Sequence, residues 1–77
     1  MEDRDLALIQ KLAPSNPELD QLWREHLELE KRLDEFDQRR YLTPEEQVER
    51  KRLQKIKLAG RDRIESILAA HRAQAPA

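Results

Sequence analysis

Thr43-Pro44-Glu45-Glu46 decides the fold of this chain, because these residues predict the start of a helix directly after a turn. Thr43 can cap a helix, Pro44 suits the first helical position, and Glu46 follows the cap at the spacing of a capping box. On both sides of this stretch, apolar residues recur every three or four positions in a highly charged sequence. The pattern predicts two long helices that fold back on each other as an antiparallel, coiled-coil-like hairpin.

The whole chain, residues 1–77, is expected to form one all-α domain. A short helix is predicted over residues 3–12, followed by long helices over 17–39 and 44–71 and a frayed tail over 73–77. The prolines at positions 14 and 17 separate the first two helices. Asn16 is the natural cap of the second helix, although Ser15 with Glu18 offers a competing capping box.

Each long helix carries an apolar seam, and the hairpin sets these seams against each other. A turn at residues 41 and 42 places side by side residues whose numbers sum to about 83, so Trp23 falls opposite Gly60. We therefore predict that Trp23 packs over Ala59 and Gly60; the alternative is that Gly60 is a tolerated glycine at a helix bend. The seams comprise Leu19, Leu22, His26, Leu29, Leu33 and Phe36 on one helix and Leu53, Ile56, Gly60, Ile64, Ile67 and His71 on the other.

The composition is typical of a long-helix protein, with 40% charged residues, one glycine and no cysteine. In a chain this short, the core rarely supplies more than about 3–5 kcal/mol without disulfides or metals. Self-association into a dimer or tetramer is therefore expected to add stability, and a groove on another protein is a second way to cover the same helix faces. The apolar residues outside the seams are expected to form this contact: Leu27, Val48, Leu58 and Leu68.

Charge is distributed unevenly between the two long helices. Residues 17–39 carry eight acidic and four basic residues, a balance of −4, whereas residues 44–72 carry five acidic and eight basic residues, a balance of +3. The basic stretch from Arg50 to Arg63 favours an alternative function, weak and salt-sensitive binding of nucleic acid. Lys51 and Lys55 point away from the seam, but the other five cations flank it. Arg50, Lys57 and Arg61 are expected on one flank of the seam, and Arg52 and Arg63 on the other. The acidic residues of the preceding helix also flank its seam, with Glu30 and Asp37 on one side and Glu18 and Glu25 on the other.

The sequence lacks the residue combinations that most enzymes need. His26 and His71 fall on different helices without cysteine, so no zinc site assembles, and neither Ser15 nor Ser66 has a histidine one turn away. The single glycine excludes a phosphate-binding loop of the usual kind. We therefore expect no catalytic residue, metal, cofactor or small-molecule substrate. His26, with Glu30 one turn on, is expected to be a seam contact that can respond to pH.

Nothing in the sequence predicts a secretory signal or a membrane span. The amino terminus is acidic, and no apolar run approaches the roughly 18 residues that a membrane-spanning helix requires. The lack of cysteine is compatible with a reducing compartment. We expect a cytoplasmic protein.

Several short strings, in this order, resemble the YdcH-like family of small bacterial proteins. The first half carries Leu8-Ile9-Gln10-Lys11-Leu12, Asn16-Pro17, Leu22-Trp23, His26 and Leu29-Glu30; the second carries Leu53-Gln54-Lys55-Ile56-Lys57-Leu58, Asp62 and Ile67-Leu68. The resemblance covers residues 6–69 and implies a helical hairpin of the bacterial cytoplasm, without an established function and without catalytic or ligand residues. The chain departs from the family pattern at Gly60, where leucine is usual, and at Arg61, where lysine is usual.

The resemblance also draws attention to four of its motif positions, His26, Lys57, Leu58 and Asp62. Lys57 falls beside His26 in the hairpin register, which places both in one contact region. Asp62 is expected to meet a basic residue of a neighbouring chain. The residues predicted to contact a partner protein are thus Trp23, His26, Leu27, Val48, Lys57, Leu58, Asp62 and Leu68.

Overall fold

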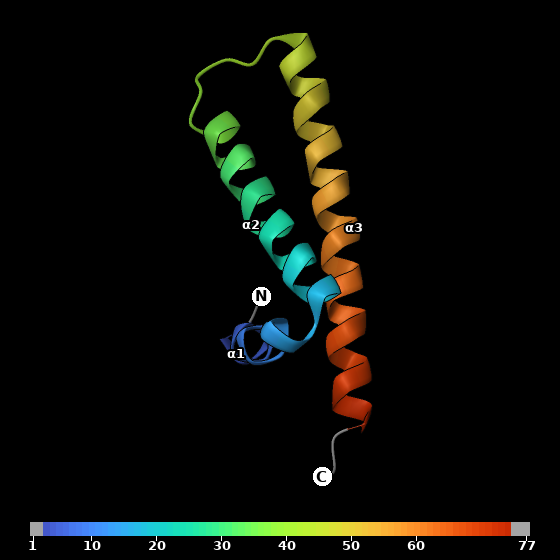
Figure 1. Cartoon of the computed structure of the whole chain (residues 1–77). Coiled ribbons are helices and arrows are strands. Elements are labelled where there is room, and N and C mark those ends of the chain that lie inside the picture. The colour runs from blue at the N-terminus through green and yellow to red at the C-terminus, as the bar shows by residue number, and fades with distance from the viewer. Residues whose placement is uncertain (1–2, 75–77) are drawn as a thin grey trace.

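A computed structural model describes residues 3–74, which form three α-helices and one 3₁₀ turn (Figure 1). The elements are α1 (Asp3–Leu12), η1 (Ala13–Ser15), α2 (Pro17–Asp37) and α3 (Pro44–Gln74). The helices α2 and α3 run antiparallel, and α1 packs against both of them at the end of the hairpin away from their connection. The structure confirms the predicted all-α hairpin preceded by a short helix.

The helix starts follow the capping residues read from the sequence. The backbone N–H of Glu46 donates to Thr43 Oγ1 and the backbone N–H of Thr43 donates to Glu46 Oε1, both at 3.1 Å, so the capping box is reciprocal. At the start of α2, the backbone N–H of Leu19 donates to Asn16 Oδ1 at 3.1 Å. Asn16 is therefore the cap, and the Ser15 hydroxyl donates instead to the carbonyl of Leu12.

The helix ends differ from the prediction by two or three residues. Helix α2 ends at Asp37 rather than at residue 39, because the backbone N–H of Gln38 still donates to Asp34 whereas that of Arg39 donates to Phe36, which ends the α-helical hydrogen-bond pattern. Helix α3 runs to Gln74 rather than to residue 71, since alanine and glutamine are good helix formers. Residues 73 and 74 of the predicted frayed tail are thus helical, and residues 75–77 lie outside the described part of the chain.

The main core lies where α1 meets the hairpin. Ile9 of α1, Leu19 of α2, and Ile64 and Leu68 of α3 are fully buried together. Burying a side chain of this size contributes roughly 1.5–3 kcal/mol, so α1 is an integral part of the fold. Toward the connection, α2 and α3 diverge (Figure 1).

The predicted packing of Trp23 over Ala59 and Gly60 is wrong. A Cβ atom added to Gly60 would meet nothing within 4 Å beyond its own stretch of helix. Trp23 instead packs against the core cluster that includes Ile9, and its ring stacks on that of His26 with centroids 5.4 Å apart. The docking of α1 explains the difference, because it supplies apolar contacts to Trp23 that a glycine cannot.

Candidate interaction surface

Salt bridges join α2 to α3 along both edges of the hairpin. At three places a basic residue of α3 meets an acidic residue of α2 beside the seam, as the helical register predicted. The pairs are Arg63 with Glu18 at 2.8 Å, Lys57 with Glu30 at 3.6 Å and Arg50 with Asp37 at 3.0 Å. Because these groups are largely exposed, each pair contributes about 0–1 kcal/mol and mainly fixes the register.

Two of the predicted cross-helix partners pair within α3 instead. Arg52 binds Glu49 at 2.6 Å and Arg61 binds Glu65 at 3.1 Å, because residues three or four positions apart are neighbours on a helix. Of the seven cations between Arg50 and Arg63, five are thereby engaged with carboxylates. Within residues 3–74, Lys51 and Lys55 form no salt bridge, and both are exposed.

His26 is buried between the two long helices, with 5% of its surface exposed. Its Nε2 lies 2.9 Å from Glu30 Oε1, and the same oxygen lies 3.6 Å from Lys57 Nζ. His26 and Lys57 therefore share one contact region, as predicted. The other ring nitrogen, Nδ1, is buried without a hydrogen-bond partner among the described residues. This arrangement makes His26 a structural seam residue with one buried ring nitrogen that lacks a partner.

Three of the four apolar residues predicted to form a second contact surface are exposed, and one is buried. Leu27, Val48 and Leu58 are 46%, 68% and 57% exposed, so all three are accessible. Val48 and Leu58 are ten residues apart, which places them about 80° apart around α3 and nearly three turns apart along it. Leu68 was predicted wrongly, because it is 1% exposed: Ile9 of α1 covers this turn of α3.

Asp62 is exposed on α3, and the structure brings no basic group of the described residues to it. Its expected contact with a neighbouring chain stays a prediction.

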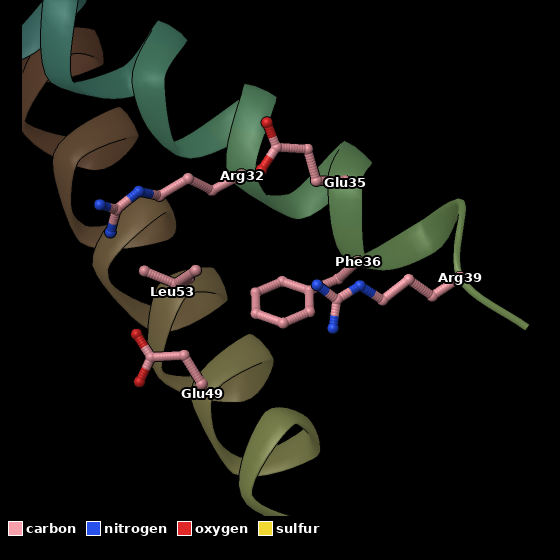
Figure 2. Close-up of a pocket in the computed structure, with 6 residues that line it drawn as sticks. All are labelled: Arg32, Glu35, Phe36, Arg39, Glu49 and Leu53. Carbon is pink, nitrogen blue, oxygen red and sulfur yellow. The ribbon is translucent and has the colours of Figure 1, made fainter. Parts of the chain in front are cut away.

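A groove lies between the diverging ends of α2 and α3. One part of it is a hollow of about 190 Å³, with the Phe36 ring and Leu53 facing each other between the helices (Figure 2). A second hollow of about 320 Å³ continues the same face toward the middle of α2. The groove residues are Glu25, Glu28, Leu29, Arg32, Glu35, Phe36 and Arg39 on the α2 side and Glu49, Leu53 and Ile56 on α3.

Charged groups of both signs line the rim of this groove. A hydrogen bond from Arg52 lowers the pKa of Glu49 below its ordinary value, and Arg32 across the groove acts in the same direction. The Arg39 guanidinium lies 5.8 Å from the centre of the Phe36 ring, within the range of a cation–π contact. The floor of the groove is apolar while its rim is charged, which is the usual anatomy of a protein-binding surface.

Sequence reasoning assigned Leu29, Phe36, Leu53 and Ile56 to the seam and did not predict the groove. Ile56 is 45% exposed and Phe36 is half-buried, because the helices separate before they can cover these side chains. A signal was present in α2: its apolar positions form two adjacent stripes, of which Leu19, His26 and Leu33 are buried while Leu22, Leu29 and Phe36 are only partly covered.

No family model, curated protein or solved structure matches the chain. The resemblance to the YdcH-like family therefore stays a prediction. In the described part of the chain, no helix is long and apolar enough to cross a membrane. Over the same residues, no three histidine, cysteine or acidic side chains are grouped as ligands of a metal ion would be.

Proposed function

We propose that this protein is a small helical-hairpin interaction module that self-associates, as a dimer or tetramer, and acts through protein–protein contacts. It carries no catalytic role in this proposal. A cytoplasmic setting is part of the proposal and is favoured by the absence of cysteine from the sequence. A bacterial origin is supported by the resemblance to the YdcH-like family alone.

The observation that carries the proposal is the large surface of the folded chain. Its solvent-accessible area is 6084 Å², whereas a folded monomer of this mass exposes about 4,900 Å². The excess of about 1,200 Å² is larger than the roughly 800 Å² that each partner buries in a stable interface of standard size. The radius of gyration is also larger than that of a compact chain of this length, 15.0 Å against about 11.5 Å. The hairpin thus exposes more extra surface than one partner would cover.

The alternative function, weak nucleic-acid binding through the basic stretch, is supported by two exposed lysines. Lys51 and Lys55 are free to meet phosphates, while the other five cations of Arg50–Arg63 already face carboxylates. Two phosphate contacts give a slope of about −1.8 in a plot of log affinity against log salt. Such binding would be weak and abolished by modest salt.

Sedimentation equilibrium of the full chain tests the proposal and its alternative together. The experiment is done at low and high salt, with and without a mixed-sequence oligonucleotide. We expect a dimer or tetramer that survives high salt and does not gain mass from the oligonucleotide. A monomer at all concentrations would overturn the proposal. A monomer that gains mass with the oligonucleotide at low salt alone would establish the alternative.

A further inference from the structure

We propose that the groove face of α2 is the self-association surface and that it binds the same face of a second copy, antiparallel, about a two-fold axis near Leu29. This inference rests on the proposed self-association and names the surface that carries it. The proposed surface does not contain the off-seam residues Leu27, Val48 and Leu58.

A second stripe of residues runs along α2 beside the buried seam. Its positions alternate by four and three, which is the spacing of a helix–helix contact. The buried seam of α2 holds Leu19, His26 and Leu33, each seven residues from the next. The second stripe lies about a quarter turn away, and its later part, from Glu25 to Phe36, opens on the groove, while Leu22 borders the core. Its members are Glu18, Leu22, Glu25, Leu29, Arg32 and Phe36.

The apolar members of this stripe are suited to pair with themselves. Leu22, Leu29 and Phe36 are spaced by seven residues, and all three are only partly buried. In an antiparallel pair centred on Leu29, that residue meets its own copy, and Leu22 meets the partner's Phe36. The contact then repeats on the other side of the axis. Each Phe36 ring would thus cover the partner's Leu22, and the partner's Leu22 would in turn fill part of the groove beside that ring.

The charged members of the stripe decide between a second copy and an unrelated helix. The half before Leu29 carries Glu18 and Glu25, and the half after it carries Arg32; Glu28 and Glu35 border the stripe on the groove side. Antiparallel pairing of this stripe with itself sets Arg32 beside the partner's Glu25, twice in each dimer. Parallel pairing would set like charges against each other. The stripe is thus electrostatically complementary to its own reverse.

The geometry of the single chain leaves room for this contact. The Arg32 side chain is 56% exposed, and its bond to Glu28 within the helix is long, at 3.9 Å. Ile56 of α3, at 45% exposure, borders the same hollow and would be covered with it. A two-fold dimer built here would be a four-helix arrangement with α2 of each copy at its centre, as in bundles formed from two hairpins.

A charge swap tests the register directly. Arg32→Glu alone and Glu25→Arg alone each set like charges across the two-fold axis. We expect each to raise the dimer dissociation constant about tenfold, because the altered ion pair occurs twice in every dimer. The double variant Glu25→Arg/Arg32→Glu restores opposite charges and is expected to return to within about threefold of wild type. All three variants change exposed positions, so the hairpin should fold, which circular dichroism verifies. The readout is sedimentation equilibrium over a concentration series.

Leu29→Glu provides a second test at the axis itself. It places two carboxylates face to face and should weaken the dimer by about 100-fold or more, because unpaired charges would be buried. Leu27→Glu and Leu58→Glu are the matched controls, since they add the same charge at exposed leucines outside the groove. We expect both to remain dimeric.

Several outcomes separate this inference from the proposed function. A wild-type chain that is monomeric throughout removes both. If wild type self-associates but the charge swap fails to restore the affinity that the single changes reduce, the antiparallel register is wrong. If the Leu27 and Leu58 variants dissociate while the groove variants do not, the self-association stands and the groove is not its surface.

Discussion

Gly60 offers a sharp test of how α2 and α3 pack, because sequence and structure predict opposite responses to its replacement. It is the single glycine of the chain and lies inside α3. If Trp23 packed over it, any added atom would clash. In the structure, an added Cβ atom meets nothing within 4 Å beyond its own stretch of helix, and no described glycine has a positive φ. Gly60→Ala should therefore be accommodated without movement of either helix.

The expected gain follows from helix propensity. Alanine is favoured over glycine inside a helix by about 0.8–1.0 kcal/mol, largely because glycine loses more backbone entropy on folding. For a chain of this length the entropy of unfolding is about 160 cal/mol/K, so the melting temperature should rise by roughly 6 °C. Thermal and urea unfolding followed by circular dichroism measure both quantities. Each is recorded at several protein concentrations, since self-association makes the apparent stability concentration-dependent.

Ala59→Gly is the matched control for Gly60→Ala. Ala59 is exposed on the same turn, so its replacement should lower the free energy of unfolding by about the same 1 kcal/mol. The double variant, which exchanges the two residues, should be close to wild type. A Gly60→Ala protein that melts below wild type would refute the reasoning, and would mean that a side chain from α2 fills the space opposite Gly60.

Three further changes probe other parts of the fold. Because a hydrogen bond from Arg72 lowers the pKa of Asp5 below its ordinary value of 3.8, that contact stabilises the fold above this pH and is lost as the pH falls through the lowered value. The melting temperature of Asp5→Asn should thus lie below that of wild type at pH 7, and the two should converge once the pH falls below the lowered pKa; a difference that persists in strong acid would contradict the assignment. His26→Leu removes the buried Nδ1 that has no partner and should raise the free energy of unfolding by about 1 kcal/mol, measured by urea unfolding, whereas a decrease of that size would show that the contact with Glu30 dominates. Thr43→Ala breaks the capping box and should cost about 1 kcal/mol in the same assay, while no change would mean that the cap contributes nothing to stability.

Short-range signals in the sequence determined the helices and their register. The caps Thr43 and Asn16 and the helix breaks at proline depend on groups a few residues apart, so the chain carries them wherever it folds. The heptad spacing predicted the burial of Leu19, His26 and Leu33, and the opposite charges predicted three salt bridges between α2 and α3. These features follow from the period of the helix alone.

Tertiary structure decided what covers each face and how far apart the helices lie. Periodicity shows which side of a helix is apolar, but it contains no distance between helices and no position for α1. Docking of α1 buries Leu68 and draws Trp23 to the core, leaving the space beside Gly60 open. Divergence of α2 and α3 toward their connection opens the groove at Phe36. Both results depend on contacts between residues far apart in the chain, which side-chain packing as a whole selects and no local pattern encodes.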